Sequence, residues 1–379
     1  MTSFLTPFTF ANGVRVENRL AVAPMTTSQS HADGAVSEAE IAWLERLARD
    51  GYGMVITCAA AVSKSSIAFE RQMSLGEDRF LPGLRTLAAA LKLHRALAIV
   101  QLCHGGSRAI PALTGRPAHA PSRYELPAVP GFVPPLAFAE AEIEQIVRDH
   151  ADAAARAHEA GFAGVELHGA NGYLHTQFLS TMTNLRADAW GGSLENRARF
   201  SREVVRAIRR LVPATFVVGF RMTFEGMGFD TGLDLDENVR VMNWLAEDGI
   251  DYGHVSSMDV RAKSAKYAGE NLFQRVRDGV ERALPLVAAG GVRSAEDVRF
   301  AMARGADLVA IARAAIGNAD VPAKLGRGET LRAMPYALDD LRELQVGDEL
   351  VRYLRDTWPI STLNVVAKEA DAASATQGA

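Results

Sequence analysis

The sequence has little cysteine and no strong excess of charge, and both absences exclude classes of protein. Its 379 residues include two cysteines, Cys58 and Cys103, each within an apolar run. This pattern excludes a disulfide framework and a cysteine-based zinc site, and both thiols are expected to be reduced and interior. The formal net charge is −4, without a block of like charge. Neither nucleic acid nor an anionic membrane surface is therefore an expected partner.

Long apolar runs are also missing. No stretch approaches the roughly 18 apolar residues needed to span a bilayer, and residues 1–13 lack the basic segment and apolar core of a secretory signal. The expectation is a cytoplasmic protein. Hydrophobic residues make up 48% of the chain and charged residues 23%, which is typical of a globular protein that buries a large core.

The sequence does contain a regular alternation of short apolar runs and longer amphipathic runs. The predicted strands are 20–25, 52–62, 97–106, 162–169, 215–224, 250–257, 285–292 and 307–316. The predicted helices are 37–51, 83–95, 140–161, 194–212, 234–249, 272–284, 294–305 and 320–328. Ser37, with Glu40 three residues later, predicts the start of the first helix, and Gly51 its end.

Eight apolar strands joined by helices indicate a parallel sheet that closes into a single (β/α)8 TIM barrel. The rival is an open doubly wound sheet, which would need a glycine-rich turn after its first strand to bind a dinucleotide. The first predicted strand ends in APMTTS, without a glycine. The predicted domains are therefore a TIM barrel at 1–330 and a C-terminal helical extension with a disordered tail at 331–379.

Three connections are longer than ordinary loops between a strand and a helix. They are 107–138, 172–192 and 257–271. Each follows a strand, so each is expected on the C-terminal face of the barrel, where active sites lie. Long structured loops at that face usually form lids or pocket walls.

The last two predicted strands end in groups that suit a phosphate. Gly290 and Gly291 let backbone N–H groups approach closely, and Arg313 offers a forked, permanent cation. In barrels a phosphate often lies between the loops after strands seven and eight. Taken singly, the glycines could make a turn and Arg313 a surface ion pair, but their matched positions favour phosphate.

Other strand ends carry polar side chains, namely Thr26, Gln101, His168, Asn171 and Arg221. A polar group on the inner wall of a barrel must find a partner or reduce stability. A flat heteroaromatic ring with several acceptors, anchored by its phosphate, would satisfy all of them. Considered alone, Gln101 or Arg221 is more simply interpreted as a buried structural hydrogen-bonding group.

At these residues the sequence resembles the Old Yellow Enzyme family of FMN-containing ene-reductases. The resemblance rests on APMT at 23–26, VQLCHGG at 100–106, HGANGYL at 168–174 and above all TNLRADAWGGSLENRARF at 183–200. It covers essentially residues 4–330. It implies one (β/α)8 barrel with non-covalent FMN at the C-terminal face, and NADH or NADPH as the hydride donor.

The resemblance also implies a role for each matching residue. The implied FMN contacts are Ala23, Pro24, Met25, Thr26, Ala59, Gln101, His168 and Arg221 around the ring, with Gly290, Gly291, Ala312 and Arg313 at the phosphate. His168 and Asn171 would hold the activating oxygen of the substrate, where two fixed donors stabilise developing negative charge. Tyr173 would donate the proton, because a hydroxyl with a reference pKa of about 10 stays protonated at neutral pH.

The reaction implied is a ping-pong reduction of the activated C=C bond of α,β-unsaturated carbonyls or nitroalkenes. Cys103 replaces a bulky tryptophan of some members and is expected to widen the substrate pocket. The alternatives are oxidative N-demethylation of a small amine or isomerisation on the same scaffold, and a sensor that binds FMN without turnover. No metal is expected. A homo-oligomer is an open possibility, because the tail helix could pack on the barrel or reach a neighbouring subunit.

Overall fold

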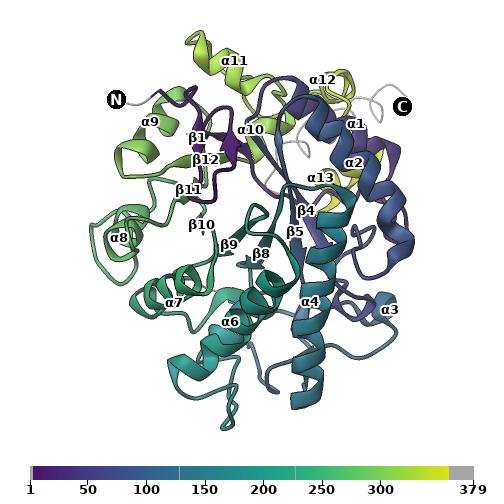
Figure 1. Ribbon diagram of the computed structural model, residues 1–379, viewed down its shortest axis with the longest axis vertical. Helices are drawn as coiled ribbons and strands as arrows, with labels where there is room; N and C mark the ends of the chain where they lie inside the picture. The colour runs from purple at the N-terminus through teal and green to yellow at the C-terminus, as the bar shows by residue number, and fades with distance from the viewer. Residues whose placement is uncertain (1–2, 128, 227, 358–379) are drawn as a thin grey trace, which may run out of the picture.

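The computed structural model describes residues 3–357 except 128 and 227. Within this part of the chain, eight parallel strands close into one barrel (Figure 1). The strands are β3 (Leu20–Val22), β4 (Met54–Ala61), β5 (Leu97–Cys103), β8 (Gly164–Gly169), β9 (Val217–Met222), β10 (Tyr252–Ser256), β11 (Leu286–Ala289) and β12 (Leu308–Ile311). They neighbour one another in chain order, and β12 pairs with β3 to close the barrel. The predicted (β/α)8 barrel is confirmed.

Helices alternate with the strands and form a ring outside them (Figure 1). They are α1 (Glu38–Arg49), α2 (Leu81–Leu93), α4 (Glu140–Ala160), α6 (Leu194–Leu211), α7 (Leu235–Asp248), α8 (Leu272–Gly279), α9 (Ala295–Ala303) and α11 (Val321–Gly326). The start of α1 follows the sequence prediction, because the Ser37 side chain accepts from the backbone N–H of Glu40 at 3.1 Å. Among the described residues, no helix is both long and apolar enough to cross a membrane.

Each barrel strand packs on both of its faces, because successive side chains point to opposite sides. On β8, Val165 and Leu167 join the outer core between strands and helices. A second core lies along the barrel axis and includes Met54, Leu97 and Leu308. The barrel is therefore filled with side chains rather than hollow at this level.

A short N-terminal hairpin closes the axial core. Its strands β1 (Phe8–Thr9) and β2 (Arg15–Val16) are antiparallel. Phe10 and Val16 belong to the axial core, and the Phe10 ring lies 5.9 Å from the ring of Tyr252 at the start of β10. The long loops lie at the opposite end of the barrel, where the strands have their C-terminal ends.

The long loops contain short elements of their own. These are the helices α3 (Pro111–Thr114) and α5 (Leu174–Leu179), the paired strands β6 (His119–Ala120) and β7 (Leu136–Ala137), and the 3-10 turns η1 (Lys64–Ser66), η2 (Asp78–Phe80), η3 (Gly106–Arg108) and η4 (Gly228–Asp230). The predicted strand 307–316 is shorter than expected. It ends at Ile311, and Arg313 begins the short helix α10 (Arg313–Ile316).

After the barrel, α12 (Leu338–Glu343) and α13 (Asp348–Thr357) lie beside α1 (Figure 1). The backbone N–H of Gly347 donates to the Gln29 side chain at 3.0 Å, and Arg71 pairs with Glu349 at 3.1 Å. The C-terminal helices therefore pack on the barrel of their own chain. The tail that was expected to be disordered, 358–379, lies outside the described residues.

Candidate active site

A cavity of about 810 Å³ lies at the C-terminal ends of the strands. Its wall includes all the residues expected to contact the cofactor, namely Ala23, Pro24, Met25, Thr26, Ala59, Gln101, His168, Arg221, Gly290, Gly291, Ala312 and Arg313. Asn171 and Tyr173 also line it. Residues from distant parts of the sequence thus meet at one place, because the carboxyl ends of all the strands lie on the same face.

Cys103 was expected to face the pocket, but it does not line the cavity. Its side chain is completely buried and packs with Ala59 and Tyr173. Burial raises the pKa of the Cys103 thiol above its ordinary value. A thiol in this position influences the cavity through the side chains that cover it, rather than by contact with a ligand.

Beneath the cavity, next to the lining residue Gln101, lies a completely buried carboxylate, Glu166. One of its oxygens accepts from Nε2 of Gln101 at 2.7 Å. The other accepts from the Tyr252 hydroxyl at 3.0 Å and faces Nδ1 of His254 at 2.8 Å. All four side chains extend from barrel strands toward the axis, immediately above the apolar core.

The charge state of this cluster follows from its partners. Burial acts to raise the pKa of Glu166, but His254, Arg221 and the Gln101 hydrogen bond outweigh it and hold the pKa below its ordinary value. Burial lowers the pKa of His254. Glu166 is therefore ionised, and neutral His254 keeps its proton on Nδ1, where the carboxylate accepts it.

Sequence reasoning missed Glu166, Tyr252 and His254. A signal was present, because Glu166 lies two residues before His168 and between the outward-facing Val165 and Leu167. In a strand with a period of two, that position points the same way as His168. A carboxylate within a buried strand therefore indicated an inward-facing partner for the polar residues already noticed.

The loop after β8 shapes the wall above the floor. Asn171 and Gly172 both have positive φ, 59° and 69°, a conformation that asparagine and glycine adopt most readily. The Gly172 N–H donates to the Asp230 side chain at 2.6 Å. This tight turn directs the chain back into α5 and brings Asn171 and Tyr173 to the same cavity.

Two side chains of this wall stay uncharged at neutral pH. Burial raises the pKa of Tyr173 to about 12, although the Arg108 guanidinium, 4.6 Å over its ring, acts in the opposite direction. Burial, reinforced by Arg221 and Arg108, holds the pKa of His168 well below its usual value. The rings of His168 and Tyr173 lie 4.8 Å apart. The wall therefore offers a neutral imidazole beside a protonated phenol.

Several polar atoms at the cavity have no partner within the described residues. They are the buried Nδ1 of His168 and Nε of Arg221, and the guanidinium of Arg313 makes no hydrogen bond or ion pair there. Unpaired buried polar groups are costly and indicate a bound partner. A planar ring rich in acceptors, with an anionic phosphate near Arg313, fits this set of donors.

Backbone packing explains the glycines beside Arg313. Gly290 and Gly291 have φ of 127° and 62°. A Cβ on Gly290 would lie 2.5 Å from the carbonyl oxygen of Ser257 and 2.8 Å from the backbone nitrogen of Asp259. Glycine is therefore required for this close approach, and it leaves the backbone uncovered at the cavity wall.

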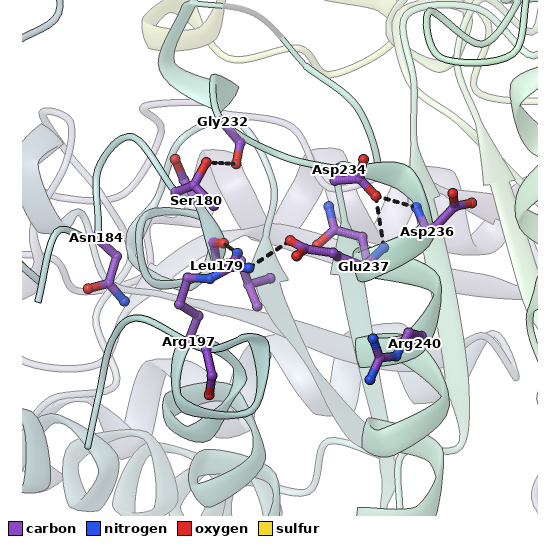
Figure 2. Close-up of polar contacts among 12 residues, drawn as sticks. Leu179, Ser180, Asn184, Arg197, Gly232, Asp234, Asp236, Glu237 and Arg240 are labelled. Atoms are coloured by element: carbon purple, nitrogen blue, oxygen red, sulfur yellow. Dashed lines mark hydrogen bonds and ion pairs between the residues drawn. The ribbon is translucent and has the colours of Figure 1, made fainter. Parts of the chain in front are cut away.

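The sequence run that carried most of the resemblance holds the loop after α5. Arg197 on α6 is buried, donates to the carbonyl oxygen of Leu179 and pairs with Glu237 of α7 at 2.7 Å (Figure 2). Asn184 donates to the carbonyl oxygen of Phe178 at 2.8 Å. These contacts fix the end of α5, the helix that begins directly after Tyr173. The run therefore supports the cavity wall from outside.

A family model described as the NADH:flavin oxidoreductase / NADH oxidase family matches residues 3–331. The chain belongs to this family. It is therefore an oxidoreductase that uses FMN and NAD(P)H, and the donors at the cavity suit such a flavin. This membership confirms the resemblance to the Old Yellow Enzyme family.

Two curated relatives and one solved structure define the similarity. The probable NADH-dependent flavin oxidoreductase YqiG of Bacillus subtilis (strain 168) is 36% identical over 352 residues, which cover 88% of this chain and 91% of that protein. The NADH:fumarate oxidoreductase of Klebsiella pneumoniae (strain 342) is 34% identical over 343 residues, 86% of this chain but 36% of that longer protein. The old yellow enzyme homologue from Zymomonas mobilis has the same fold, with a TM-score of 0.79 at 23% identity over 90% of this chain and 96% of that one.

Proposed function

We propose that the protein is an ene-reductase that reduces the activated C=C bond of α,β-unsaturated carbonyls or nitroalkenes with NAD(P)H by a ping-pong mechanism in the cytoplasm. The observation that carries the proposal is the cavity wall on which His168, Asn171 and Tyr173 gather with uncharged ring side chains. The name of the fumarate oxidoreductase relative also supports it, because fumarate is an activated alkene.

Bound FMN supplies the hydride, and the residues of the chain supply the remaining chemistry. His168 and Asn171 donate to the activating oxygen of the substrate, where negative charge develops during reduction. His168 is neutral and has one N–H for this purpose. Donors that bind the developing charge more tightly than the ground-state oxygen accelerate the reaction.

Tyr173 holds the proton that the α-carbon receives. Its raised pKa keeps the hydroxyl protonated across neutral pH, so the acid is always loaded before the alkene arrives. The Arg108 guanidinium, 4.6 Å over the ring, stabilises the phenolate that remains after transfer. Solvent then reprotonates Tyr173.

The decisive experiment separates the two half-reactions by stopped flow. Tyr173→Phe is expected to slow alkene reduction by about 10²- to 10⁴-fold, the usual contribution of a positioned acid, while flavin reduction by NADH stays nearly unchanged. Tyr124→Phe is the matched control, since Tyr124 is also buried but bonds to Ser107 and does not line the cavity. Equal slowing of both half-reactions by Tyr173→Phe would refute the acid assignment.

Phenols test the donor pair, because a phenolate oxygen imitates the developing enolate oxygen. His168→Ala is expected to weaken phenol binding by about tenfold or more, the cost of one lost hydrogen bond to a charged group. Unchanged phenol affinity would count against the pair. Anaerobic reduction followed by mixing with a cyclic enone also separates this function from N-demethylation or sensing, since only an ene-reductase is rapidly reoxidised.

A further inference from the structure

The Gln101 amide at the cavity floor has a single permitted orientation. Its Nε2 donates to Glu166 at 2.7 Å, and an ionised carboxylate can only accept. The amide oxygen must therefore point away from Glu166. That oxygen has no hydrogen-bond partner among the described residues, and Gln101 lines the cavity. The floor consequently presents a hydrogen-bond acceptor at this point, and not a donor.

We propose that Glu166 is a positioning residue that fixes Gln101 as the acceptor for the imide N–H of the flavin ring, and thereby selects the flavin and adjusts its reduction potential. The inference rests on the proposed function and on the contact between Gln101 and FMN that the family resemblance implies. It assigns a task to a carboxylate that does not itself line the cavity. Glu166 acts by fixing the orientation of the Gln101 amide, and not by contact with the cofactor.

The carboxylate cannot rotate freely to release Gln101. Its second oxygen is held by the Tyr252 hydroxyl at 3.0 Å and by Nδ1 of His254 at 2.8 Å. The Tyr252 ring occupies the space above Gly219, where a Cβ would lie 2.1 Å from the ring. Two donors on one oxygen and one on the other give the carboxylate a fixed direction in a buried site.

The charge of Glu166 is expected to affect the reduction potential of the flavin as well. Glu166 offsets the positive charge of Arg221 beneath the ring site, and His254 is neutral. Asp230, at the cavity wall, is a second acidic group that acts on Arg221. Replacement of the carboxylate by an amide leaves Arg221 less compensated. Additional positive charge near the ring favours the electron-rich reduced flavin.

The test uses apoprotein reconstituted with FMN or with its N3-methyl derivative, which lacks the imide N–H. In Glu166→Gln, the new amide keeps its oxygen toward Tyr252 and His254 and turns its NH₂ toward Gln101. Gln101 must then flip and present its own NH₂ to the ring. Fluorescence titration is expected to show FMN affinity at least about tenfold weaker, the effect of one unpaired buried group. The preference of the wild type for FMN over the methylated flavin should largely disappear.

The reduction potential gives a readout that a simple loss of structure does not produce. Spectroelectrochemistry of reconstituted Glu166→Gln is expected to give a more positive midpoint potential than the wild type. The double variant with Gln101→Met should bind FMN no more weakly than Gln101→Met alone, because Glu166 acts through that amide. Additive losses in this cycle would show that Glu166 acts by another route.

Glu40→Gln is the matched control. Glu40 is equally buried, but its carboxyl group lies outside the barrel and accepts from the Ser30 and Cys58 side chains, and burial raises its pKa. This control should retain the wild-type flavin preference and potential. Folded Glu166→Gln with an unchanged preference overturns the inference, as does wild-type protein that binds both flavins equally.

Two further outcomes keep the test decisive. If Glu166→Gln does not fold, Gln101→Met removes the acceptor with the carboxylate in place, and retention of the FMN preference in that variant overturns the inference. Failure of the proposed function can be distinguished from failure of the role inferred for Glu166. Apoprotein that prefers FMN but never reduces an alkene refutes ene-reduction alone, whereas an active ene-reductase without the preference refutes the role of Glu166 alone.

Discussion

Glu40 and Glu166 are both completely buried, yet their pKa values shift in opposite directions. Glu40 lies on α1 outside the barrel, where its oxygens accept from the neutral Ser30 hydroxyl and from the Cys58 thiol at 3.1 Å. Burial dominates there and raises the pKa of Glu40. On the barrel axis, His254 and its neighbours lower the pKa of Glu166 in spite of equal burial.

The difference shows that burial alone does not decide whether a carboxyl group ionises. Hydrogen bonds from neutral hydroxyl or thiol groups do not offset the desolvation of a charge, whereas several N–H donors and a nearby cation do. The layer outside the barrel therefore contains a buried acid whose pKa is raised by desolvation. The axis uses the same residue type to build a local field under the ligand cavity.

The largest expected contrast is in stability after the carboxyl groups are removed. Glu166→Leu leaves Gln101, Tyr252 and His254 without their acceptor and should cost about 3–5 kcal/mol. Glu40→Leu should cost only about 1–2 kcal/mol, because the hydroxyl and thiol groups that lose their acceptor can rotate and no buried cation loses its counter-charge. Urea unfolding of the two apoproteins measures both values. Equal losses of unfolding free energy in the two variants would show that the two carboxyl groups do not differ in their contribution to stability.

Glycine substitutions offer a smaller contrast between the same two regions. Gly219→Ala would place a Cβ 2.1 Å from the Tyr252 ring, which should cost about 1–3 kcal/mol through overpacking and also weaken FMN binding through Glu166. Gly161→Ala at the end of α4 meets no atom within 4 Å but retains φ of 93°. It should cost about 1–2 kcal/mol with FMN affinity unchanged. Weakened FMN binding in Gly161→Ala would contradict this separation of regions.

The smallest expected effect is a difference in pH dependence. The folded pKa of Glu166 is lowered, so its contribution to stability is present above the ordinary value of 4.5 and is lost as pH falls through the folded value. The folded pKa of Glu40 is raised, so its contribution is present below 4.5 and is lost as pH rises through the folded value.

Glutamine variants isolate these two contributions. Relative to the wild type, Glu166→Gln should become less destabilising as pH falls below the ordinary pKa of the carboxyl group. Glu40→Gln should instead become more favourable as pH rises from there toward neutrality. Unfolding free energies of the three proteins over this range provide the measurement, and slopes of the same sign would show that the two sites do not differ.

Local sequence patterns were enough to predict the barrel and much of the cavity wall. The start of α1 depends on Ser37 and Glu40, which are three residues apart, so it is visible in the sequence. The turn at Asn171 and Gly172 is similarly local. Roles within the wall remain proposals, because they depend on where the ligand lies. Arg313 lay within the predicted strand 307–316 but begins a helix, an example of an uncertain strand boundary.

Other features required the folded chain. Cys103 was expected at the substrate pocket because it replaces a bulky tryptophan of some family members, yet it packs beneath Ala59 and Tyr173. The C-terminal extension could have reached another subunit, but Leu350 is buried against the chain's own barrel and lines the cavity. Both outcomes depend on which distant segments pack over a strand end, information that no local pattern contains.

The amino-acid sequence by itself determined the alternation of strands and helices, the glycine turns and the presence of polar side chains at strand ends, because these follow from the properties of neighbouring residues. Only closure of the barrel decided that Gln101, Glu166 and His254 meet. They come from three strands, and a charged group buried on the axis is tolerated only where such distant partners surround it. The ionised floor of the cavity is thus a property of the tertiary structure.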